Sequence, residues 1–140
     1  MMTEERMKDE FYALSQAFSP KQFRLTSSSL TIALQTNSKK VYTVKIELAN
    51  FPYEVPKVFI TNPKPLYDRL GNSMLGASHP MHTLTGENGC TRICHYGASQ
   101  WHPGVLLYQV VVKVRVWLEV YETHLKTGHS LDRYLSTAAW

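Results

Sequence analysis

The feature that most constrains the fold is an apolar segment from Gly104 to Leu125 that contains no proline and no internal glycine. The stretch 110–116 is rich in β-branched residues and has the propensity of a strand. The whole segment is, however, far longer than an ordinary strand. We therefore expect a buried central helix that packs on a sheet and ends at Gly128.

Upstream of this segment the sequence predicts one helix followed by strands. Thr3 precedes two glutamates, and apolar residues recur at spacings of three and four, which predicts a helix over about 4–17 that ends at Ser19-Pro20. Alternation of apolar and polar residues then predicts strands at 23–25, 30–34, 41–48 and 57–60, with a turn at 37–39. Strands joined by short links form an antiparallel β-meander with one face in water, so the expected fold class is α+β.

From Thr61 to Glu87 no regular pattern is visible, because prolines and glycines recur throughout. A loop of this length inside a compact domain is uncommon and tends to carry function. It leads directly into the stretch from Gly89 to Pro103, which holds both cysteines of the chain and two of its six histidines. We therefore expect a long active-site loop between the meander and the central helix.

Composition restricts the class of protein. The 140 residues suit a single domain, with a core at about 4–125 and a short extension at 126–140, in which Trp140 either packs on the last helix or is a docking contact. A net charge of +4 carried by scattered basic residues does not predict binding to nucleic acid. Neither a signal peptide nor a membrane-spanning run is visible, so we expect a soluble protein in the reducing cytoplasm, where free thiols persist.

Cys94 is the candidate nucleophile. Nucleophilic chemistry needs a thiol with thiolate character and access to solvent, which a loop supplies. His82 and His95 are its candidate basic neighbours in the sequence. The alternative is that Cys94 is a small, half-buried packing residue.

A zinc site is a second alternative. Cys90 and Cys94 have a spacing that zinc ligands use, and two of four histidines could complete the set: His79, His82, His95 and His102. No second regular pair of ligands follows, and no glycine-rich phosphate loop is present, so we expect neither a metal nor another cofactor. His124 and His129 are expected to be solvated near the end of the long helix.

Several spaced motifs together resemble the ubiquitin-conjugating (E2-like) enzymes. The stretch Phe51-Pro52-Tyr53-Glu54-Val55-Pro56-Lys57-Val58-Phe59-Ile60 resembles the family segment FP-x-x-YP-x-x-PP-x-V-x-F. His82, Gly89 and Ile93-Cys94, followed by Trp101-His102-Pro103 and 106–110, resemble the family signature HPN…G-x-ICL…W-x-P-x-x-x-L-x-x-V. The resemblance covers about residues 4–125. It implies the ubiquitin-conjugating (UBC-like) fold, with Cys94 as the residue that carries a protein C-terminus as a thioester.

The sequence departs from that signature at two positions. If His82 matches the family histidine, Leu84 occupies the position of the family asparagine. If His79 is the match instead, Met81 occupies that position. The donor that stabilises the oxyanion must then be a backbone N–H group or another side chain. His95 also replaces the leucine that usually follows the cysteine.

These departures, together with the segment 117–128, resemble the prokaryotic E2-like branch, closest to the stand-alone proteins of CBASS anti-phage defence operons. The resemblance implies that Cys94 accepts the C-terminus of a cyclic-oligonucleotide synthase, a nucleotidyltransferase, and passes it to a lysine amine. It further implies a possible need for a separate adenylating enzyme. We expect His82 to shape the loop or polarise the carbonyl, with His95 as the second candidate. The alternatives are a catalytically silent UBC-like binding module and a zinc-stabilised domain.

Overall fold

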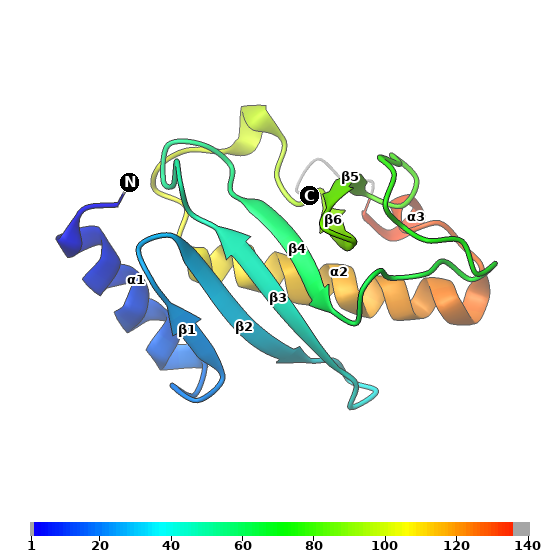
Figure 1. Cartoon of the computed structure of the whole chain (residues 1–140), viewed down its shortest axis with the longest axis horizontal. Helices are drawn as coiled ribbons and strands as arrows, with labels where there is room; N and C mark the ends of the chain where they lie inside the picture. Colours follow the sequence, from blue (N-terminus) through cyan, green and yellow to red (C-terminus); the bar gives the residue numbers. More distant parts are fainter. Residues whose placement is uncertain (1, 136–140) are drawn as a thin grey trace.

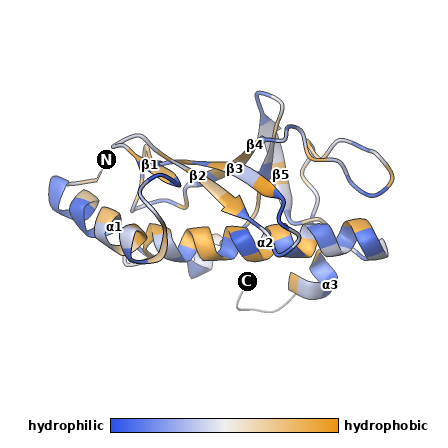
Figure 2. Ribbon diagram, turned by 90° about the horizontal axis from the view of Figure 1, so that it is seen from below, coloured by the Kyte–Doolittle hydropathy of each residue, from blue (hydrophilic) through white to orange (hydrophobic). Residues whose placement is uncertain are grey.

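The computed structural model describes residues 2–135, which form an antiparallel six-stranded sheet with helices α1 and α2 on one face (Figures 1 and 2). The predicted position of Trp140 lies outside the described residues, as do 136–139. The helices are α1 (Glu4–Ala17), α2 (Leu107–Thr127) and α3 (Asp132–Leu135), with a 3-10 turn η1 (Ala98–Gln100). The strands are β1 (Phe23–Leu25), β2 (Ser29–Gln35), β3 (Val41–Glu47), β4 (Lys57–Asn62), β5 (Thr83–Glu87) and β6 (Cys90–Ile93), in the sheet order β1-β2-β3-β4-β6-β5. The α+β class is confirmed.

Helix α1 begins and ends where the sequence predicts. The Thr3 hydroxyl accepts a hydrogen bond from the Arg6 backbone N–H at 3.1 Å, which caps the first turn. The helix ends at Ala17, directly before Phe18 and the Ser19-Pro20 pair. Its apolar face is only partly covered, because Leu14 is fully buried whereas the Phe11 side chain remains half exposed.

The predicted meander is confirmed in strands β1 to β4. In the β2–β3 pair, Leu30 lies opposite Ile46 and Ile32 lies opposite Val44, and all four side chains are completely buried. Their neighbours in sequence, such as Lys45, point to the other face. One face of the sheet therefore forms the core against the helices, and the other is largely polar, with Phe59 opposite Lys45 as a buried exception.

The prediction of an irregular segment up to Glu87 is wrong at its end. Residues 83–87 and 90–93 form the β5–β6 hairpin, and β6 pairs with β4, so that Val58 lies opposite Ile93. Asn88 and Gly89 make the turn with positive φ angles of 55° and 75°. These angles suit the tight Asn-Gly turns that fit the strand twist. Cys90 consequently lies in a strand rather than in a loop.

Helix α2 confirms the predicted long helix and supplies the centre of the core. Its buried side chains recur on one stripe: Leu107, Val110, Val111, Val114, Trp117, Leu118, Tyr121 and His124. Figure 2 shows this helix running beneath the sheet with apolar and polar residues interleaved along it. Gly128 ends it with a φ of 78°, and its N–H donates to the His124 carbonyl at 2.8 Å.

A buried ion pair anchors the start of α2 to α1. The Glu10 carboxylate, fully buried, accepts from Arg6 Nε at 2.7 Å and from the Leu107 N–H at 2.8 Å. The Arg6 guanidinium also donates to the carbonyls of Pro103 (2.7 Å) and Val105 (2.9 Å). The segment that enters α2 is therefore fastened to α1 by charge-assisted hydrogen bonds.

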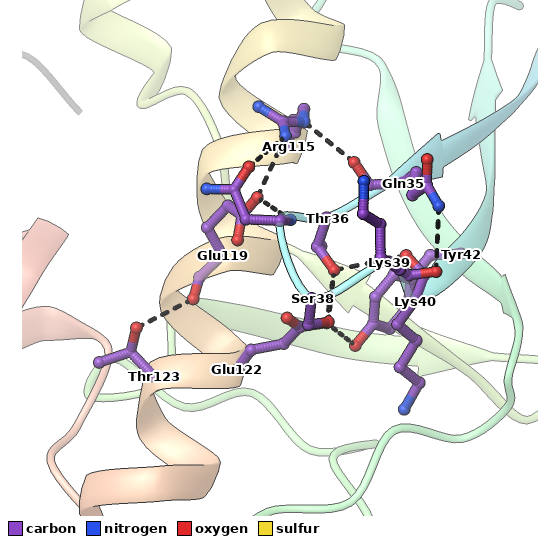
Figure 3. A network of polar contacts seen from close by, with 11 residues as sticks. Gln35, Thr36, Ser38, Lys39, Lys40, Tyr42, Arg115, Glu119, Glu122 and Thr123 are labelled. Atoms are coloured by element: carbon purple, nitrogen blue, oxygen red, sulfur yellow. Dashed lines mark hydrogen bonds and ion pairs between the residues drawn. The ribbon is translucent and has the colours of Figure 1, made fainter.

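The turn between β2 and β3, together with the start of β3, is bonded to the C-terminal half of α2 (Figure 3). The Glu122 carboxylate accepts hydrogen bonds from the hydroxyls of Thr36 and Tyr42, each at 2.8 Å. Burial raises the pKa of Glu122, but these hydrogen bonds outweigh it and the pKa lies below its ordinary value. Burial, together with the bond to Glu122, raises the pKa of Tyr42. The carboxylate therefore stays ionised at neutral pH.

The chain after α2 returns to the sheet. His124 is buried, not solvated as predicted: its Nε2 accepts from the Arg69 N–H at 3.1 Å, and its Nδ1 donates to the His129 carbonyl at 2.7 Å. Leu131 and Leu135 enter the core beyond it. Within residues 2–135, no helix combines the length and apolar character needed to cross a membrane.

Candidate active site

Cys94 follows β6 directly and lies on the wall of a surface pocket. Its side chain is half-buried, and its backbone N–H donates to the His82 carbonyl at 2.9 Å. The pocket has a volume of about 500 Å³ and is lined by 77–79, 82–84, 94–97 and 99–100. It therefore lies between the end of the long loop and the segment that follows β6, where Cys94 and His82 share one cavity.

His82 is held rigidly in an uncommon backbone conformation. Its φ is 51°, in the left-handed region, and its side chain is buried. Its carbonyl accepts two hydrogen bonds, from the Cys94 N–H and from Trp117 Nε1 at 3.1 Å. The backbone of His82 thus joins the cysteine to the central tryptophan of α2.

Asp132 completes the environment of the His82 imidazole, and no pattern in the sequence predicts this contact. Its Oδ1 lies 2.7 Å from His82 Nε2 and 3.6 Å from His79 Nε2. The Asp132 backbone N–H donates to the Pro80 carbonyl at 2.8 Å. Asp132 belongs to the part of the chain predicted as an extension beyond the core, and 50 residues separate it from His82.

His95, the second predicted histidine, lies beside Cys94 but is buried within the protein. Only 3% of its surface is exposed, and within the described residues its Nε2 makes no hydrogen bond. Burial lowers the pKa of His95 to about 3, although a hydrogen bond with the Ile93 backbone acts in the opposite direction. His95 is therefore neutral near pH 7 and supplies no positive charge to the thiol.

Lys113 brings a positive charge to the site from α2. Its Nζ donates to the His95 carbonyl at 2.9 Å and lies 3.9 Å from the centroid of the Tyr96 ring. Burial lowers the pKa of Lys113, while attraction to Cys94 opposes that effect. Lys113 is a partly buried residue of the long helix, and no motif of the sequence pointed to it as a residue of this site.

The segment between Cys94 and α2 is fixed by aromatic contacts. The Tyr96 and Trp101 rings are perpendicular, with centroids 5.3 Å apart. Trp101 Nε1 donates to the Pro52 carbonyl at 2.9 Å, and its ring meets Phe51 edge-on. The two motifs that resemble a known family, one around Phe51 and one around Trp101, therefore touch.

Cys90 does not join the Cys94 site. It is buried in β6, where its Sγ lies 3.7 Å from the Asn88 carbonyl oxygen. Among residues 2–135, no three or more His, Cys, Asp or Glu side chains are grouped so that they could hold a metal ion. The side chains of the zinc alternative are consequently not gathered around one point.

The chain matches no known protein family, no curated protein and no solved structure.

Proposed function

We propose that this protein is an E2-like conjugating enzyme in which Cys94 carries a protein C-terminus as a thioester and transfers it to a lysine amine. The observation that carries the proposal is the shared pocket of Cys94 and His82, with the Cys94 N–H bonded to the His82 carbonyl at 2.9 Å. A half-buried thiol at the edge of a pocket has both the access and the polar surroundings that a nucleophile needs.

The transfer requires a nucleophile and a proton acceptor but no cofactor. The amine nitrogen attacks the thioester carbonyl, a C–N bond forms, and the C–S bond breaks with its electron pair remaining on Cys94 Sγ. The proton lost by the amine passes to His82 or to water. The ammonium group of Lys113, which is attracted to Cys94, stabilises the departing thiolate.

The UBC-like fold is part of this proposal. The order of parts agrees with it: α1 precedes the meander of β1 to β4, the candidate cysteine follows, and the long helix α2 packs on the sheet. The contact of Trp101 with the Pro52 carbonyl joins the two family-like motifs in space. The β5–β6 hairpin fixes the positions of His82 and Cys94, on either side of it, relative to each other.

The proposed cargo is the C-terminus of a cyclic-oligonucleotide synthase in an anti-phage defence system of the CBASS type. An adenylating enzyme that activates this C-terminus and an acceptor protein that offers a lysine are the further proposed partners. The reducing cytoplasm is the proposed compartment, since both Cys90 and Cys94 are free thiols.

The test is intact-mass analysis of the protein co-expressed with its operon neighbours, beside Cys94→Ser and Cys90→Ser. We expect an adduct that reducing agents and hydroxylamine remove, that persists in Cys90→Ser, and that becomes a reductant-resistant ester in Cys94→Ser. Loss of the adduct in both variants, or an adduct in Cys94→Ser that reducing agents still remove, refutes the assignment of Cys94.

The same samples distinguish the alternatives. A binding module would retain a partner without any adduct, and Cys94→Ser would bind that partner as well as the parent does. A zinc-stabilised domain would lose stability on treatment with a chelator, and both cysteine variants would share that loss.

A further inference from the structure

We infer that Asp132 is a positioning residue of the Cys94 site, which holds the His82 imidazole in the tautomer that accepts a proton during the chemistry of Cys94. The inference rests on the proposed function and adds a residue that the resemblance does not supply. Its basis is the 2.7 Å contact between Asp132 Oδ1 and His82 Nε2, made from a short helix that follows α2.

The position of Asp132 is set by its own segment. Its backbone N–H donates to the Pro80 carbonyl at 2.8 Å, two residues before His82. Leu131 and Leu135, on either side of it, are buried in the core. The carboxylate therefore stands on a backbone that is anchored both to the loop and to the core, which limits how far it can move from the imidazole.

The contact determines which nitrogen of His82 carries the proton. A neutral imidazole bonded to a carboxylate through Nε2 keeps its proton on Nε2, so Nδ1 becomes the acceptor. The backbone of His82 cannot shift to relax this arrangement, because its carbonyl is bonded to both Cys94 and Trp117. The negative charge of Asp132 also stabilises the imidazolium that forms when Nδ1 takes a proton.

Two steps use this acceptor. When Cys94 attacks an acyl donor, the S–C bond forms, the donor's leaving group departs with its electron pair, and the thiol proton passes to His82 Nδ1, which then gives it to the leaving group or to water and is again free to accept. When a lysine amine then attacks the thioester, the C–N bond forms, the C–S bond breaks, and the amine proton passes to the same nitrogen.

Other charged or titratable groups face this pair. His79, from the preceding turn, lies 3.6 Å from Asp132 Oδ1 and has an exposed side chain. Lys113, from α2, acts on Cys94, and the buried His95 follows Cys94 in the chain. Of the two imidazoles near the Asp132 carboxylate, His82 lies closer, at 2.7 Å against 3.6 Å for His79, so substitution of Asp132 acts on Cys94 chiefly through His82.

The inference is tested by the rate at which iodoacetamide alkylates Cys94, measured over a range of pH by intact mass in a Cys90→Ser background. In this reaction the S–C bond forms, iodide leaves and the thiol proton is lost, and neither cargo nor partner is needed. Asp132→Ala, Asp132→Asn, His82→Asn and the double variant Asp132→Ala/His82→Asn are compared with the background protein. Asparagine suits position 82 because it tolerates the left-handed backbone.

We expect each single variant to slow alkylation near neutral pH by about tenfold, which is less than the roughly 100-fold or more that a general base typically contributes to catalysis. Asp132→Asn fills the same space, but its amide can also donate to Nε2 and so stabilise the other tautomer. The double variant should be no slower than His82→Asn, because residues that act through one another are not additive.

Two matched controls separate positioning from a general loosening of the segment. Tyr134→Phe removes the hydrogen bond between the Tyr134 hydroxyl and His129 Nδ1 (2.9 Å) but leaves Asp132 in place. Arg133→Ala removes an exposed charge from the same short helix and also leaves Asp132 in place. Both should retain the parent pH–rate profile.

The inference is overturned if Asp132→Asn keeps the parent profile, or if the effects of Asp132→Ala and His82→Asn multiply in the double variant. Because alkylation needs no cargo, this outcome is independent of the adduct experiment. If no adduct forms but the effects of Asp132 and His82 on alkylation are coupled, the proposed cargo is refuted and Asp132 remains a positioning residue. If the adduct forms but the two effects are not coupled, the proposed cargo stands and the role of Asp132 is refuted.

Discussion

The ion pair of Arg6 and Glu10 leads to a stability prediction. The variant Glu10→Ala removes a fully buried carboxylate that accepts from Arg6 Nε and from the Leu107 N–H. A buried N–H left without an acceptor costs about 1–3 kcal/mol. Breaking a buried ion pair costs about 3–5 kcal/mol, and the lower end applies here because Arg6 keeps the carbonyls of Pro103 and Val105.

Since both costs arise from the same carboxylate, they overlap, and we expect Glu10→Ala to lower the free energy of unfolding by about 3 kcal/mol. For a domain of this size that corresponds to a fall in Tm of about 10 °C. Glu10→Gln keeps an oxygen for the Leu107 N–H but loses the charge opposite Arg6, so about half of the cost is expected. The measurement is urea unfolding followed by tryptophan fluorescence, with Tm from calorimetry as a second readout.

Asp9→Ala is the matched control, because Asp9 is the neighbouring carboxylate on α1 and is exposed. It should change stability by no more than about 0.5 kcal/mol. If Glu10→Ala costs less than about 1 kcal/mol, or no more than Asp9→Ala, the argument from the buried ion pair is wrong.

Three further predictions concern charges near Cys94 and in the core. Lys113→Met should slow alkylation of Cys94 by up to about tenfold near neutral pH, whereas Lys113→Arg retains most of the rate; equal rates in all three proteins would exclude an effect of this charge. Because the pKa of Glu122 is lowered in the folded protein, its carboxylate stabilises the fold at neutral pH, and this stabilisation is lost as pH falls through the folded-state pKa. Glu122→Gln should therefore cost about 1 kcal/mol at neutral pH and less in acid, and a cost that is constant in urea titrations at both pH values contradicts this. For His95, the unfolded chain takes up a proton below about pH 6.5 and the folded protein does not until about pH 3, so stability falls as pH drops through that window. Between pH 6.5 and 5 the parent protein should lose about 2 kcal/mol of unfolding free energy through His95, and His95→Leu should abolish this loss, as measured by urea unfolding at each pH. If His95→Leu has the same pH dependence of stability as the parent, His95 is not buried in its neutral state.

The helices and the first four strands could be predicted because their signals are local. The Thr3 cap, the breaker at Ser19-Pro20 and the left-handed Gly128 each mark a helix boundary within a few residues. The alternation in β2 and β3 specifies which side chains enter the core. These elements depend on neighbours in the sequence, so one sequence suffices to predict them.

The β5–β6 hairpin was missed although the sequence carries a signal for it. Asn88-Gly89 is the dipeptide that tight hairpin turns favour. The strand before it, Thr83–Glu87, has too few apolar residues to show the alternation of a half-buried strand. Continuing the alternation from Ile93 would also have indicated that His95 points inward and Cys94 does not.

The contact of Asp132 with His82 had no signal in the sequence. Fifty residues separate the two, and their meeting depends on the turn after α2 and on the burial of Leu131. His124 was misjudged for the same reason, because its partners come from Arg69 and His129. Polar contacts between distant segments are set by tertiary packing, which periodicity does not record.

The two outer strands of the sheet also have a consequence for self-association. β1 has only three residues, with the exposed Arg24 in the middle, and at the opposite edge the pairing of β5 with β6 shifts register between Leu84 and Glu87. A short charged strand and an irregular one offer poor templates for pairing with another chain. Neither edge strand of the sheet therefore favours the edge-to-edge pairing from which fibrils grow, even at high protein concentration.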